Sequence, residues 1–422
     1  MGSGTKAIFS WLKSAGHHPV TLDLKLSPAT PSSALHELFL LHGSHTRGLS
    51  LTAPFSALQG LATMFQTAPS RHRPLFPNVE VLHFSMPCKD MNRPSTRRFT
   101  AMRNIDLRGC AKLRTLQFDS IDNSFGFITD HLISGTPYSQ LTHLYITERS
   151  LHPLVARKIL MGCCSLTRCY MQIGQWPQDD DVPVSDDFIT LGHLDALVVR
   201  FASDNHGLIS PFFETLTLPS LRRLTIEAPN ALDADLVLVL KEMQDRSKAP
   251  IERLALMNIF IIRDQLLDLL SSLPTLQYLH VQAPPGETCC GYIDVLIAIS
   301  LPDTARLVPL LEEICIVDNL FPRYSDESGR LARDLVGKPL DISNPLKDYQ
   351  VLEAIEKRCS YYRPAATQGL RDPGVGRKAL QVVTVKWRNV PEEWRDAERP
   401  ALARQEEIED QFEVAFYLPL CA

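Results

Sequence analysis

The chain has 422 residues, of which 45% are hydrophobic and 22% charged, and its formal net charge is -5 at pH 7. A single core stops growing at roughly 250–300 residues, so two domains or one elongated repeat array are expected. The charge balance has neither the basic excess typical of nucleic-acid binding nor a strong acidic field for cationic ligands, so neither partner class is predicted.

A six-residue phrase, apolar-x-x-apolar-x-apolar, recurs along the chain. From Leu113 to Leu276 it begins at positions 113, 141, 166, 194, 221, 251 and 276, which differ by 28, 25, 28, 27, 30 and 25. Further copies begin at Val79, Leu311 and Leu380. A nearly constant period in the twenties indicates a leucine-rich repeat. The alternative is a leucine-rich α/β protein in which the phrases occur by chance.

Apolar stripes lie between the phrases and predict amphipathic helices. One stripe covers Leu58 to Phe65, another Leu232 to Met243, and a third Leu266 to Leu273, each with apolar residues three or four positions apart. Pro274 follows the third stripe and is expected to end that helix, because proline lacks the N–H and clashes with the preceding turn.

These strands and helices predict an α/β fold, namely a leucine-rich-repeat solenoid with a curved parallel sheet on its concave side and helices on its convex side. Single repeats cannot bury their apolar faces alone, so they must stack. The expected divisions are an N-terminal segment 1–16, a repeat domain 17–390 and a charged C-terminal cap or tail 391–422. An irregular insertion at 321–345 and a loop at 364–376 interrupt the repeats, and 392–416 is predicted to contain a terminal helix.

Two phrases resemble a known family. The stretch from Trp11 to Leu22 resembles the "W-L-x-R-S-G-x-x-P-L-x-L" start of the repeat region in fungal, basidiomycete-type F-box/leucine-rich-repeat proteins, and Tyr138 to Leu144 resembles their "W-S-Q-L-T-H-L" phrase. The stretches Phe76 to Leu82 and Leu218 to Leu224 are similar to their "P-x-L-x-x-L" strands. The resemblance covers roughly residues 8–390.

The resemblance implies a substrate receptor of a cullin–RING ubiquitin ligase, in which an F-box docks the ligase adaptor and the repeats hold an unknown protein target. No F-box is recognisable before Trp11, so adaptor and cullin are expected partners only if one lies upstream. The alternatives are an orphan repeat scaffold without a ligase link and, more distantly, an enzyme of unknown class.

No pattern predicts a catalytic residue, a cofactor or a metal. The G-x-G-x-x-A match at Gly374 precedes a strand instead of opening a helix, as a dinucleotide site requires. His36 and Glu37 lack the second histidine at position 40, and the acidic run from Asp179 to Asp187 lacks the spacing of a calcium loop.

The cysteines and the N-terminus predict an intracellular protein, either cytoplasmic or nuclear. The ten cysteines include no C-x-x-C and no zinc-finger spacing, which favours reduced, mostly buried thiols. Residues 1–16 lack the apolar stretch of a signal peptide, and no run of about 20 apolar residues predicts a membrane span.

The binding surface is predicted on the concave sheet face. In each phrase the apolar residues point into the core and the residues between them point out. Tyr and Arg are common where binding energy concentrates, which favours an aromatic and basic track as the partner-binding site. The predicted residues are Tyr145, Tyr170, Arg200, Arg223, Tyr278 and His280.

Overall fold

The structure is a computed structural model, and its residues fall into two compact units. It describes residues 10–11, 14–16, 18–27, 32–54, 76–86, 107–120, 135–147, 151–174, 188–201, 209–231, 235–284, 295, 298–299, 307–319, 381–388 and 415–417. Unit 1 comprises Met1–Asn205 and Thr215–Ser220, and unit 2 comprises His206–Glu214 and Leu221–Ala422.

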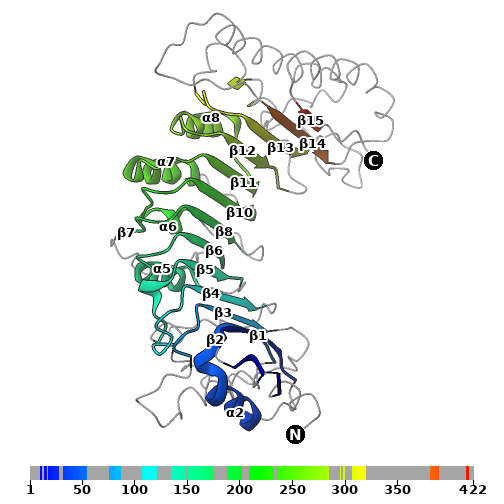
Figure 1. Cartoon of the computed structure of the whole chain (residues 1–422). Helices are drawn as coiled ribbons and strands as arrows, with labels where there is room; N and C mark the ends of the chain where they lie inside the picture. Colours follow the sequence, from blue (N-terminus) through cyan, green and yellow to red (C-terminus); the bar gives the residue numbers. More distant parts are fainter. Residues whose placement is uncertain are drawn as a thin grey trace, which may run out of the picture. The chain divides into compact units, whose positions relative to one another are not determined.

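Unit 1 is built on parallel strands that pair in chain order, as Figure 1 shows. These strands are β1 (Val20–Lys25), β2 (Thr46–Thr52), β3 (Val81–Met86), β4 (Thr115–Ser120), β5 (His143–Ile146), β6 (Arg168–Ile173) and β8 (Ala196–Phe201). Its helical segments are α2 (Ser32–His42), η1 (Gly43–His45), η4 (Tyr138–Gln140) and α5 (Pro153–Gly162). The short strands β7 (Ile189–Thr190) and β9 (Leu216–Thr217) form a separate parallel pair.

Unit 2 repeats the same plan. Its strands pair in parallel and in chain order as β10 (Arg223–Ala231), β11 (Arg253–Ile259), β12 (Tyr278–Gln282), β13 (Glu313–Asn319), β14 (Val382–Arg388) and β15 (Ala415–Tyr417). Its helices are α6 (Ser210–Phe213), α7 (Leu236–Ser247) and α8 (Arg263–Ser271). Parallel neighbours need a crossover, and α7 and α8 supply it between β10 and β11 and between β11 and β12.

The recurring phrase coincides with the core. Its first apolar residue lies just before each strand and is fully buried, as at Leu113, Leu141, Leu166 and Leu194, each 0% exposed. The next two apolar positions align from strand to strand, so that Leu224, Leu254, Leu279 and Ile314 form one continuous buried row. The periodic leucines therefore stack across neighbouring strands, which is how short strands can share one core.

The two apolar stripes that lie in described residues form the predicted helices α7 and α8. Leu236, Val239, Leu240 and Met243 of α7 are buried, as the stripe ending at Met243 predicted. The helix α8 ends at Ser271, before Pro274, with Leu266, Leu269 and Leu270 buried. The helix predicted from Leu58 to Phe65 lies outside the described residues.

The mixed α/β class with an extended parallel sheet in each unit is confirmed. The sequence analysis missed β1, β2, β7 and β9. It was also wrong at the end of the predicted terminal helix, where Ala415 and Phe416 begin β15 beside β14. Aromatic residues favour this extended conformation.

The insertion at 321–345, the loop at 364–376 and residues 1–9 lie outside the described residues. Among described residues, no helix is long and apolar enough to cross a membrane.

Candidate functional site

In each unit one face of the sheet points into the core and the other carries the residues between the buried ones. The alternation is visible in β8, where Leu197, Val199 and Phe201 are buried and the residues between them are not. We call this second face the open face. In unit 1 it carries Ser50, His83, Gln117, Asp119, His143, Tyr145, Thr147, Arg168, Tyr170, Gln172, Ala196, Val198 and Arg200; in unit 2 it carries Arg223, Thr225, Glu227, Arg253, Ala255, Met257, Tyr278, His280, Gln282, Glu313 and Cys315.

Aromatic side chains meet on the open face of unit 1. Tyr145 on β5 lies directly opposite Tyr170 on β6, and Tyr170 lies opposite Val198 on β8. The His143 and Tyr145 rings stack with their centroids 6.5 Å apart. Directly opposite side chains on neighbouring strands lie about 5 Å apart, so the two tyrosines and Val198 form a continuous apolar row.

Two arginines border this row on opposite sides. Arg168 lies two residues before Tyr170 and faces His143, while Arg200 lies two residues after Val198 and faces Gln172. Both arginines are exposed. Burial and the nearby charge of Arg168 together lower the pKa of His143, so its ring is neutral at pH 7.

The open face of unit 2 combines the same residue types. Arg223, Arg253 and Tyr278 lie side by side on β10, β11 and β12, and the Arg253 guanidinium sits over the Tyr278 ring, 5.2 Å from its centroid. Burial raises the pKa of the Tyr278 hydroxyl, Cys315 and Glu313 add to the rise, and Arg253 opposes it. The phenol therefore keeps its proton at neutral pH and can donate a hydrogen bond.

A polar network crosses β2, β3 and β4 of unit 1. Ser50 Oγ lies 3.2 Å from His83 Nδ1, and His83 Nε2 lies 2.7 Å from Asp119 Oδ2. Gln117 Nε2 donates to the same carboxylate over 2.9 Å, and Thr147 Oγ1 donates to its other oxygen over 3.0 Å. Because an ionised carboxylate only accepts hydrogen bonds, His83 Nε2 carries a proton, and in the neutral ring the Ser50 hydroxyl donates to Nδ1.

This network has the serine, histidine and carboxylate order of an acyl-transfer site, but the geometry around it does not complete one. Such a site needs convergent N–H donors for a developing oxyanion. The N–H groups of β2 and β3 are used in the parallel ladder with their neighbours. Among described residues, the network therefore supports a role in orienting side chains on the open face.

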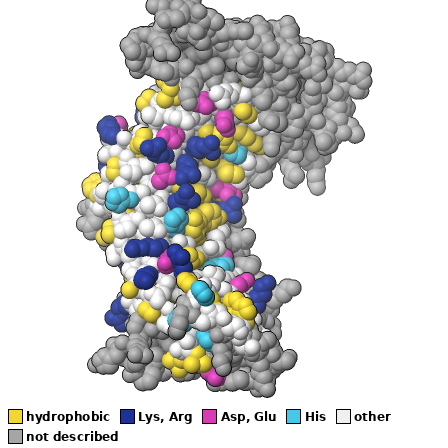
Figure 2. All heavy atoms as spheres, viewed as in Figure 1, with side chains coloured by type: hydrophobic (Ala, Val, Ile, Leu, Met, Phe, Trp, Pro, Cys, Tyr) yellow, Lys and Arg dark blue, Asp and Glu magenta, His cyan; other side chains and the backbone are white. Residues whose placement is uncertain are grey.

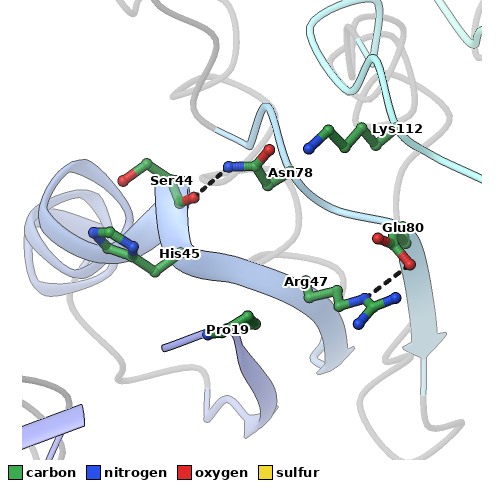
Figure 3. A pocket seen from close by; sticks show the side chains of 7 residues that line it. All are labelled: Pro19, Ser44, His45, Arg47, Asn78, Glu80 and Lys112. Carbon is green, nitrogen blue, oxygen red and sulfur yellow. Dashed lines mark hydrogen bonds and ion pairs between the residues drawn. The ribbon is translucent and has the colours of Figure 1, made fainter. Parts of the chain in front are cut away.

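A pocket of about 350 Å³ opens where β1, β2, β3 and β4 begin. Figure 3 shows its lining, to which each of these strands or the turn before it contributes. Arg47 Nε pairs with Glu80 over 2.8 Å, and Asn78 Nδ2 donates to the Ser44 carbonyl over 2.7 Å. Since the Arg47–Glu80 pair neutralises itself, Lys112 and His45 remain as the further basic groups of the lining.

The structure brings the predicted residues together in two groups. Tyr145, Tyr170 and Arg200 lie on neighbouring strands of unit 1; Arg223, Tyr278 and His280 lie on β10 and β12 of unit 2, with Arg253 of β11 in the row between Arg223 and Tyr278. All six lie on the open face. Figure 2 shows basic, hydrophobic, acidic and histidine side chains mixed on the surface in view, without a field of one sign.

The six predicted positions left out Arg168, Arg253, Ser50 and His83. The spacing that predicted Tyr170 and Tyr278 also puts Arg168 and Arg253 on the outward side of their strands, although neither is among the six. Ser50 was missed with its strand, because Thr46 takes the first apolar position of β2.

Comparisons with known proteins do not assign this surface. No protein-family model matches the chain, and no curated protein matches its sequence. Within the described part of the chain, no cluster of three or more histidine, cysteine or acidic residues could hold a metal ion. Function must therefore be inferred from the open faces themselves.

Proposed function

We propose that this chain is a leucine-rich-repeat protein that binds another protein through the open face of its sheet and does not catalyse a reaction. The observation that carries the proposal is the alignment of the leucine phrases, strand beside strand, in both units. In each unit, this alignment presents tyrosine and arginine side chains in rows on neighbouring strands.

The chemistry of these rows suits a protein partner. Tyrosine and arginine supply a large share of binding energy in protein interfaces, since they offer wide apolar contact together with hydrogen-bond donors. Small-molecule sites are usually concave and mostly apolar. The rows of the open face instead expose polar and aromatic groups over several adjacent strands, which suits an extended macromolecular surface.

Alanine substitution of Arg223 and Tyr278 together tests the proposal in unit 2. The double variant should capture at least tenfold less partner from an extract of the source cells than the wild type does, because it loses an arginine and an aromatic contact. Bound proteins are quantified by mass spectrometry. The melting temperature should stay within about 2 °C, since Arg223 is exposed and Tyr278 half-buried.

The matched control replaces Ile262 and Arg263 with alanine, because both are exposed at the start of α8 and lie outside the open face. This variant should capture as much partner as the wild type. Equal loss in both variants, or no loss in either, would remove the open face of unit 2 from consideration.

The resemblance to F-box proteins supports a narrower proposal, in which the bound protein is a target of a cullin–RING ubiquitin ligase. Its test is co-purification of the full-length gene product with the ligase adaptor. Target capture without adaptor binding would favour the orphan scaffold, which uses the same open face without the ligase.

A further inference from the structure

We propose that the open face of β5, β6 and β8 in unit 1 binds an extended acidic segment of a partner protein, with two carboxylates flanking one apolar side chain. This inference rests on the proposed docking function and specifies the chemistry of the partner. It follows from three features of the face: its charge, its apolar row and the spacing of its two arginines.

The charge of this face is one-sided. Its residues on the open face are His143, Tyr145, Thr147, Arg168, Tyr170, Gln172, Ala196, Val198 and Arg200, of which Gln172 is buried. They include two arginines and no Asp or Glu. Asp119, on the neighbouring β4, already accepts hydrogen bonds from His83, Gln117 and Thr147. A partner that places carboxylates here meets complementary charge and no repelling neighbour among these nine residues.

The row between the arginines is apolar and aromatic. Tyr145, Tyr170 and Val198 lie in register on three neighbouring strands, and both tyrosines are half-buried. An apolar side chain of the partner can cover these rings, while the phenol hydroxyls provide hydrogen bonds at the edge. The arginines then lie on either side of the position where that apolar side chain sits.

The distance between Arg168 and Arg200 sets the spacing of the two carboxylates in the partner segment. Gln172 lies opposite Arg200 and four residues after Arg168, so the two arginine Cα atoms are separated by about 14 Å, from a rise of about 3.3 Å per residue and one strand spacing of about 4.8 Å. An extended peptide covers that span in about four residues. Residues i, i+2 and i+4 of an extended chain point to the same side. The partner motif is therefore acid-x-apolar-x-acid.

The test is a selection of random 12-residue peptides displayed on phage against the immobilised full chain, followed by sequencing. We expect Asp or Glu pairs four residues apart, with an apolar residue midway, to be enriched at least threefold over acidic pairs at other spacings. The most enriched peptide is then synthesised with a fluorescent label, and its affinity is measured by polarisation at low salt.

Alanine at Arg168 and Arg200 together should weaken binding of that peptide at least fourfold, since each exposed ion pair contributes about twofold to threefold. The matched control, alanine at Arg108 and Lys158, removes the same charge from unit 1 outside the open face and should leave the affinity unchanged. Replacing Tyr145 and Tyr170 with alanine should also weaken binding.

The outcomes separate this inference from the function on which it rests. Selected peptides that lack acidic pairs but lose affinity when Tyr145 and Tyr170 are replaced would overturn the acidic motif and leave docking intact. Acidic peptides that bind the Arg168 and Arg200 variant as tightly as the wild type would also overturn it, because they would bind elsewhere, for example at the pocket beside Lys112. If no peptide is enriched and the variant with alanine at Arg223 and Tyr278 captures as much partner as the wild type, both the acidic motif and the proposed docking function are contradicted.

Discussion

Neighbouring residues of one type differ in chemistry because the fold gives them different surroundings. Cys163 is fully buried at the end of α5, and burial together with the neighbouring thiol of Cys164 raises its pKa to about 12. Cys164 is exposed, and its Sγ lies 3.4 Å from the Ser139 carbonyl. Because the thiolate is the nucleophile, burial makes Cys163 inert.

Alkylation with iodoacetamide at pH 8 should therefore modify Cys164 at least 100 times faster than Cys163. Burial shields the Cys163 sulfur from the reagent and raises its pKa to about 12, so very little of it is thiolate at pH 8. The peptide from Ile159 to Arg168 carries both residues, and its fragmentation spectrum distinguishes them. Equal rates in the folded protein would contradict the burial of Cys163; after unfolding in guanidinium the rates should converge.

At the scale of single elements, the end of α7 carries a local strain. Lys248 follows the helix with φ of 50°, and its N–H donates to the Gln244 carbonyl over 2.7 Å. This left-handed conformation ends helices well but favours glycine, because a Cβ approaches the backbone oxygen. Lys248 also pairs with Asp245, but both side chains are more than 70% exposed, so the pair adds little.

Lys248→Gly should therefore raise the free energy of unfolding of unit 2 by about 1 kcal/mol, measured by urea denaturation. The control is Lys248→Ala, which keeps the strained φ and removes only the ion pair. It should change stability by less than about 0.5 kcal/mol. A destabilised glycine variant would contradict the backbone strain at Lys248.

At the scale of the whole molecule, stability in each unit rests on rows of apolar residues that several strands share. Leu256 of β11 is 0% exposed, and its neighbours across the sheet are Ile226 and Val281, which are also buried. A cavity at Leu256 therefore removes contacts from three strands at once. A single strand with its connecting segment could not compensate, because it cannot bury its apolar residues alone.

Leu256→Ala should lower the free energy of unfolding by about 3 kcal/mol and speed amide exchange in β10 and β12 as well as in β11. Thr225→Ala on the open face serves as the control and should leave both quantities nearly unchanged. Hydrogen exchange with mass spectrometry gives the readout. Faster exchange confined to β11 would mean that the neighbouring strands do not share its core.

The sequence by itself predicted the α/β class, the leucines that are buried and the side of each strand that faces outward. These are local properties: a strand alternates its side chains with period two, so the phrase at Leu276, Leu279 and Val281 also predicts that Tyr278 and His280 point away from the core. The same reasoning located α7 and α8 from their apolar stripes.

Only the tertiary structure decided which outward residues meet. Ser50, His83 and Asp119 are 33 and 36 residues apart along the chain, and they touch because β2, β3 and β4 pair in one register. The contact of Arg253 with Tyr278 likewise depends on the register of β11 and β12. Spacing along one strand is a property of the local backbone, whereas the neighbour across the sheet depends on the pairing of distant segments.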